Sequence, residues 1–119
     1  MKMIHNMKLT PAPFDAIKRG EKTIELRLYD EKRRKIRVGD KIVFTNTETG
    51  ERLCAAVVAL HLFESFAALY QSLPLLKCGY TETTLSHADP ADMDRYYSAK
   101  EQRLYGAVGI ELDRIELER

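Results

Sequence analysis

The sequence predicts an α+β fold in which a mostly antiparallel sheet or small β-barrel carries short helices at its ends. Three observations support this prediction. Alternating apolar residues mark strands near both ends of the chain. The turn at residues 47–50 joins two central strands as a hairpin, and helix-capping residues followed by apolar stripes mark helices in the second half.

The first predicted elements are a strand, a short helix and a second strand. Residues 3–9 alternate in part and predict the first strand. Pro13 opens a short helix because its fixed φ suits a first helical position, and Gly20 follows the last turn. Residues 22–29 alternate between apolar and polar side chains and form the clearest strand of the sequence.

The middle of the chain is predicted to form a hairpin. Residues 30–35 are a highly charged connector, expected to make one helical turn, and residues 38–40 form a tight turn into a strand at 41–45. The turn at 47–50 ends in a glycine, which supplies a positive φ. Residues 52–62 then return as a long apolar strand.

Helices and a closing strand are predicted in the last part of the chain. Ser65 caps a helix with an apolar stripe, and Pro74 stops it. Asp89 caps another helix, with Pro90 at its first position. Residues 105–112 alternate as a last strand.

The length and composition predict one domain, residues 1–119, in the cytoplasm. A chain of 119 residues has the commonest size of a single domain. Neither a signal-peptide stretch nor a run approaching the roughly 20 apolar residues of a membrane span is present. Cys54 and Cys78 have no metal-type or redox-type spacing, so we expect reduced structural thiols.

Positive charge is concentrated in one segment. Residues 18–41 contain ten Lys or Arg and five Asp or Glu, a local balance of +5. The whole chain carries +1, so the remainder carries −4. This asymmetry predicts a positive face on a nearly neutral body, which attracts anionic ligands without general stickiness.

The strand at 22–29 contains the first candidate site. Glu25 and Arg27 are two residues apart and therefore project from the same side, with Lys22 at the entry of the strand. The guanidinium can donate to a phosphate or a carbonyl, and Lys22 can act as a point charge or a base. The alternative is a solvated face with a weak surface ion pair.

A run of five cations forms the second candidate site. A cation cluster can contact successive phosphates, and each contact adds to a salt-dependent affinity. The alternative is a solvated loop, which four consecutive like charges more often indicate. The run gains weight because it follows the strand at 22–29 directly, and it comprises Lys32, Arg33, Arg34, Lys35 and Arg37.

Two adjacent tyrosines form the third candidate site. Tyr96, if exposed, could stack on a base, whereas the helical spacing from Met93 favours a core position for Tyr97. The sequence has neither a phosphate-cradling glycine loop nor a clustered set of metal ligands. We therefore expect no cofactor and no metal, and neither a nucleotide-hydrolysing nor a zinc enzyme.

The segment Gly20-Glu21-Lys22-Thr23-Ile24-Glu25-Leu26-Arg27, followed by Gly39-Asp40 before a strand, resembles the ASCH domain family, and in particular its bacterial stand-alone members. The central signature of that family is GxKxxExR, which is residues 20–27 here, and a Gly-Asp pair before a strand follows it. The similarity spans nearly the whole chain. The residues that carry it are Met7-Lys8-Leu9, Pro13-Phe14, Ile17-Lys18, Gly20, Lys22, Glu25, Arg27, Gly39-Asp40, Tyr96-Tyr97-Ser98 and Tyr105-Gly106-Ala107-Val108-Gly109-Ile110.

The resemblance implies a PUA-like β-barrel with short helices around a cleft, and a role in binding RNA. It implies that Lys22, Glu25 and Arg27 line that cleft. One bacterial branch of the family is an amidohydrolase on acetylated cytidine that uses a lysine, a threonine and a glutamate. Its lysine corresponds to Lys22, its threonine position is held by Glu25, and Glu82 is the candidate match for its glutamate. A carboxylate cannot repeat the role of a hydroxyl nucleophile, although Lys22 and Glu25 could form a catalytic acid/base pair.

The leading hypothesis is therefore a binding module for RNA, a nucleoside or a nucleotide. In this hypothesis Lys22 and Arg27 meet anionic or carbonyl groups. Glu25 orients Arg27 or accepts a hydrogen bond from a base, and the cations of residues 32–37 steer the phosphate backbone. The alternatives are a metal-independent amidohydrolase on an acylated nucleoside such as acetylcytidine, and a protein-interaction adaptor. No membrane association is expected.

Overall fold

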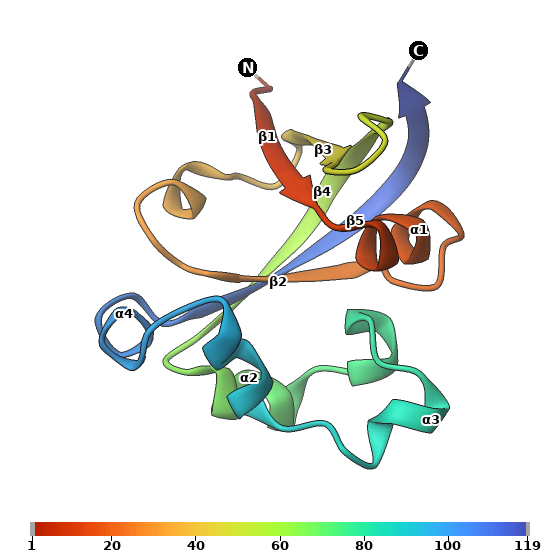
Figure 1. The fold of residues 1–119 in the computed structure, drawn as a ribbon. Helices are drawn as coiled ribbons and strands as arrows, with labels where there is room; N and C mark the ends of the chain where they lie inside the picture. The colour runs from red at the N-terminus through yellow and green to blue at the C-terminus, as the bar shows by residue number, and fades with distance from the viewer. Residues whose placement is uncertain (1, 119) are drawn as a thin grey trace.

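The computed structural model describes residues 2–118, which form one curled five-stranded sheet with short helices (Figure 1). The strands are β1 (Ile4–Leu9), β2 (Ile24–Leu28), β3 (Lys41–Asn46), β4 (Arg52–Phe63) and β5 (Ala107–Glu118). The helices are α1 (Pro11–Lys18), α2 (Phe66–Ser72), α3 (Glu82–Leu85) and α4 (Ala99–Tyr105), with 3₁₀ turns η1 (Arg33–Lys35), η2 (Leu75–Cys78) and η3 (Pro90–Arg95). Within the described part, no helix has the length and apolarity to cross a membrane.

The sheet has the strand order β1-β3-β4-β5-β2, so β1 and β2 are its two edges. The pairing of β1 with β3 is parallel, and the other three pairings are antiparallel. Two register shifts between β4 and β5, at Cys54/Ala56 and Val57/Ala59, bend these long strands. The predicted mixed, mostly antiparallel barrel is confirmed in the form of a curled half-barrel.

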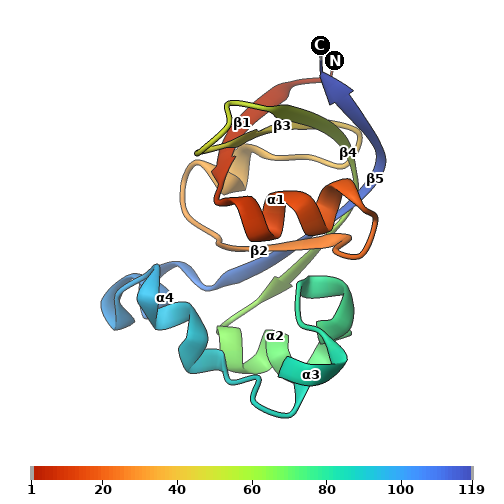
Figure 2. The ribbon, with the colours of Figure 1, turned by 45° about the vertical axis from the view of Figure 1, so that its right-hand side comes forward.

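Helices cover the half-barrel at two places (Figure 2). Helix α1 connects the two edge strands and lies between β1 and β2. The remaining helices form a layer between the end of β4 and the start of β5. Two apolar clusters result: a barrel core that includes Phe14, Ile17, Phe44, Val108 and Ile110, and a helix-side core that includes Ile24, Leu28, Phe66, Leu69 and Ala107.

Most predicted elements occur where the sequence placed them, and α1 shows a small difference. The helix begins at Pro11 and not at Pro13, with Thr10 as its N-cap. Both prolines fit in the first turn because the first N–H groups of a helix have no intrahelical partner. Gly20 follows the helix with a φ of 79°, as predicted for its C-terminal position.

Helix α4 and the length of β5 were not predicted. Ser98 caps α4 through a reciprocal box with Glu101, a signal that the sequence contains. The helix occupies residues up to Tyr105, so the last strand starts at Ala107 and not at 105, and it runs to Glu118 beside β4. The predicted helix after Asp89 is a 3₁₀ helix, η3, with the expected cap.

Asp40 joins the start of β3 to the edge strand β1. Its buried carboxylate accepts hydrogen bonds from the His5 Nε2 atom (2.8 Å) and from the backbone N–H groups of Met3 (3.2 Å) and Arg37 (3.0 Å). The His5 hydrogen bond, followed by the two backbone hydrogen bonds, lowers the Asp40 pKa from 3.8 to about 2. The ionised carboxylate therefore helps to fix the turn before β3.

This pKa predicts a specific loss of stability in acid. The unfolded chain binds a proton at Asp40 near pH 3.8, whereas the folded chain does so near pH 2. The contribution of Asp40 is therefore complete above pH 3.8 and disappears as the pH falls toward 2. In urea unfolding, we expect Asp40→Asn to be less stable than wild type above pH 3.8, with the difference shrinking toward pH 2. A difference that is constant over this range would contradict the assignment.

Candidate functional site

Lys22, Glu25 and Arg27 form one buried charged triad. The Lys22 Nζ atom lies 2.8 Å from Glu25 Oε1, and the Arg27 Nε atom donates to Glu25 Oε2 at 2.7 Å. The three side chains are 10%, 4% and 14% exposed, respectively. The structure therefore brings together the three residues of the first candidate site, and they do not form a solvated surface pair.

The ends of the triad are fixed by neighbouring elements. The Thr23 N–H donates to the Lys77 carbonyl at 2.8 Å, which ties the start of β2 to η2. Gly79 follows η2 with a φ of 111°, and a Cβ atom there would lie 3.3 Å from the Lys22 Cδ atom. The backbone at Gly79 thus passes closely over the Lys22 side chain, and its positive φ favours a glycine at this position.

The triad keeps its charges. Burial by itself would raise the Glu25 pKa, but the charges and hydrogen bonds of Lys22 and Arg27 outweigh burial and lower it below 4.5. Burial would lower the Arg27 pKa, but the Glu25 charge and hydrogen bond outweigh burial and raise it above its usual value, with a further contribution from Tyr97. Glu25 is therefore an ionised acceptor that holds Arg27 in one orientation.

Arg27 also spans the gap between the two edges of the sheet. Its Nη2 atom donates to the Lys8 carbonyl oxygen at 3.1 Å. Lys8 lies on β1 and Arg27 on β2, and these strands are the opposite edges of the half-barrel. The guanidinium thus links the edges where backbone pairing is absent.

A basic hollow lies beside this link. We call it the seam pocket; its volume is about 390 Å³. Four of its lining residues are cations, and Asp30 neutralises part of the Arg33 charge at 2.9 Å. The Arg33 Nε atom is buried without a hydrogen-bond partner among the described residues. The pocket is lined by Asn6, Met7, Lys8, Arg27, Lys32, Arg33 and Thr45.

The model of the ASCH domain family matches residues 7–116 of the chain. The chain belongs to the ASCH domain family. The resemblance noted from the signature at residues 20–27 is thus confirmed. A comparison with curated proteins finds no match.

Three solved structures are similar to this ASCH protein over most of its length. Hypothetical protein PH0355 has a TM-score of 0.73 and 32% identity, over 99% of this chain and 100% of that chain. Protein PF0455 from Pyrococcus furiosus has a TM-score of 0.70 and 31% identity, over 97% of each chain. A variant of ASCH from Zymomonas mobilis has a TM-score of 0.70 at 16% identity, over 98% of this chain and 71% of that chain. The last likeness shows the fold alone, and the predicted PUA-like fold class is confirmed.

The cation run of this ASCH domain is divided by η1. Lys32 and Arg33 line the seam pocket, whereas Arg34 lines a second hollow near Tyr29 and Tyr105. Lys35 and Arg37 are exposed and line neither hollow. The binding roles of these residues remain predictions.

The tyrosine pair and Glu82 lie apart from the seam pocket. Tyr96 is exposed, whereas Tyr97 is partly buried and stacks on Phe66 with ring centroids 6.0 Å apart. Glu82 is exposed at the start of α3, and its side chain makes no hydrogen bond or ion pair with other residues of 2–118. The stacking role of Tyr96 stays a prediction.

The sequence interpretation missed Lys8, Asn6 and Thr45 as lining residues. Lys8 lies within the resemblance motif of residues 7–9, which was the available signal. Its proximity to Arg27 depends on the closing of the half-barrel, which local periodicity cannot indicate. Among residues 2–118, no three His, Cys, Asp or Glu side chains are grouped as a metal site.

Proposed function

We propose that this ASCH domain binds RNA and holds the phosphates of the strand in the seam pocket. One observation carries the proposal: Arg27 is fixed by Glu25 and by the Lys8 carbonyl beside a pocket that three further cations line. Fixed guanidinium groups recognise phosphate oxygens with several donors at once. ASCH domains are generally thought to bind RNA, which agrees with this chemistry.

Each charged residue has a distinct role in this proposal. Arg27, Lys8, Lys32 and Arg33 contact phosphate oxygens. Glu25 does not contact RNA, because both of its oxygens are occupied by Lys22 and Arg27. In this proposal the protein binds RNA as a single domain in the cytoplasm. Cys54 and Cys78 are free thiols, as expected in that compartment.

The salt dependence of RNA binding tests the proposal. Four phosphate contacts on a single strand predict a slope of about −3 for log affinity against log salt. The affinity should therefore fall about 50-fold between about 50 and about 200 mM salt, measured by fluorescence anisotropy with a labelled single-stranded RNA. The same titration with single-stranded DNA measures the contribution of the 2′-hydroxyl groups. Undetectable RNA binding at low salt, or an RNA affinity that does not change with salt concentration, would contradict the proposal.

The short contact between Lys22 and Glu25 favours one alternative, an amidohydrolase on an acylated nucleoside. The lowered pKa leaves Glu25 able to act as a base but not as a proton donor near neutral pH. Release of cytidine from acetylcytidine, detected by chromatography and abolished by Lys22→Ala, would favour this enzyme. Absence of release across a panel of acylated nucleosides counts against it.

A protein-interaction adaptor is favoured if RNA and nucleosides fail to bind and a partner co-purifies.

A further inference from the structure

Two consecutive arginines of η1 line two different hollows. Arg33 lines the seam pocket, and Arg34 lines a wider hollow of about 820 Å³, which we call the Arg34 pocket. The Cα atoms of consecutive residues are only about 3.8 Å apart. The two hollows therefore flank the same turn, and a ligand strand that leaves the seam pocket over η1 continues toward the Arg34 pocket.

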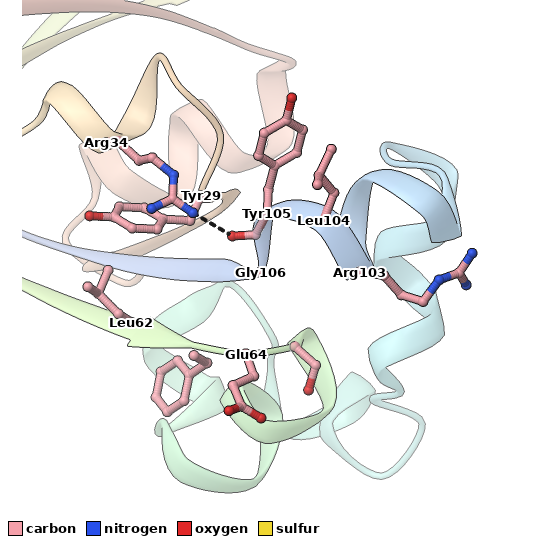
Figure 3. Close-up of a pocket in the computed structure, with 10 residues that line it drawn as sticks. Tyr29, Arg34, Leu62, Glu64, Arg103, Leu104, Tyr105 and Gly106 are labelled. Carbon is pink, nitrogen blue, oxygen red and sulfur yellow. Dashed lines mark hydrogen bonds between the residues drawn. The ribbon is translucent and has the colours of Figure 1, made fainter.

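The Arg34 guanidinium lies over the Tyr29 ring in this pocket (Figure 3). Its central carbon lies 4.4 Å from the centre of the Tyr29 ring, and its Nη2 atom donates to the Tyr105 carbonyl at 3.3 Å. Arg34 is nevertheless an exposed residue. Tyr29 and the Tyr105 carbonyl therefore hold the guanidinium in place, and because Arg34 remains exposed, a planar group can stack on it.

The other walls of the Arg34 pocket combine apolar and polar groups. Leu62 and Leu104 are 53% and 65% exposed and leave apolar surface at the pocket. Glu64, Ser65 and Arg103 line the same hollow with an acceptor, a hydroxyl and a cation. A flat ligand with apolar faces and a polar edge matches this lining, whereas a phosphate would leave the leucines without a partner.

We propose that the Arg34 pocket receives an unpaired nucleobase, which stacks on the Arg34 guanidinium. This inference rests on the proposed RNA binding in the seam pocket, because the strand that supplies the base is held there by its phosphates. Unpaired bases stack on arginine planes, whereas bases within a duplex are already stacked on each other. The preferred ligand is therefore single-stranded RNA that crosses η1.

Removal of single bases from the RNA tests the proposal. An oligonucleotide of about 12 nucleotides is used with one abasic site moved along it, position by position. For the wild-type protein, we expect one or two neighbouring positions at which base removal weakens binding about 5- to 100-fold. Arg34→Lys keeps the charge but not the plane, so it should remove this position-specific penalty and bind intact and abasic RNA alike.

Arg52→Lys is the matched control, because Arg52 is an exposed arginine outside both hollows and outside the candidate cation run. This variant should keep the penalty of the wild type. An Arg34→Lys protein that keeps the penalty overturns the stacking proposal. Salt-sensitive binding of wild type without any position-specific penalty also overturns it but leaves the proposed function intact. Absence of RNA binding at low salt overturns both.

Discussion

Glu25→Gln is expected to reduce the free energy of unfolding by about 3–5 kcal/mol. The substitution keeps the size of the side chain but leaves two positive charges, on Lys22 and Arg27, without their shared carboxylate. Both cations are largely buried. Removal of one partner from a buried ion pair has a large effect because the remaining charge is desolvated without compensation.

Urea or thermal unfolding at neutral pH measures this loss. For a chain of this length, the expected change corresponds to a decrease in melting temperature of roughly 10–20 °C. Glu21→Gln is the matched control, because Glu21 pairs with Arg19 over the same two-residue separation but on the surface. The exposed pair is screened by solvent, so the control should unfold like wild type. Equal effects of the two substitutions would show that the triad does not behave as a buried unit.

The triad also shows how far a strand pattern can be interpreted. The alternation of residues 22–29 correctly predicted that Glu25 and Arg27 share a face opposite Ile24 and Leu28. In the structure both faces of the strand are covered: the helix-side core buries the apolar face, and Glu25 on the polar face is buried as well. The alternation did not indicate this burial of the polar face. Burial of the polar face depends on contacts with residues distant in the chain, such as Lys8 and Gly79. Periodicity therefore predicted the face of the strand on which each side chain lies, whereas the burial of these side chains could be seen only in the folded structure.

The cation run illustrates a different limit. A count of charges in residues 32–37 treats the segment as one positive patch. The 3₁₀ turn η1 instead directs Arg33 and Arg34 into separate hollows and leaves Lys35 exposed. In a short turn, consecutive side chains point in different directions, so charge density along the sequence does not translate into charge density at one site. The direction of each side chain required the structure.

Helix α4 was missed for a local reason. Its cap signal, Ser98 with Glu101, was present, but neither residue is followed by a clear apolar stripe, and the described helix buries no residue fully. Helices are recognised from sequence chiefly by an apolar face. A surface helix with a good cap and a weak apolar face therefore escapes an analysis based on periodicity.

The largest functional effect is expected when three cations of the seam pocket are neutralised together. In the combined variant Lys8→Gln, Lys32→Gln and Arg33→Gln, only Arg27 remains to contact phosphate. Each lost contact removes about 0.7 from the slope of log affinity against log salt on a single strand. The slope should therefore change from about −3 to about −0.7, and RNA affinity near physiological salt should fall by about two orders of magnitude.

A second triple variant separates the position of the charges from their number. Lys35→Gln, Arg37→Gln and Lys41→Gln remove the same charge from exposed residues outside the seam pocket. Between about 50 and about 200 mM salt, the control should lose RNA affinity about 50-fold, like wild type, whereas the pocket variant should lose only about threefold. Unfolding curves establish that both variants are folded. If the two variants weaken RNA binding equally, the affinity is determined by net charge and not by the seam pocket. Non-specific attraction depends on the total charge of the protein, whereas binding in a pocket depends on where the charges lie.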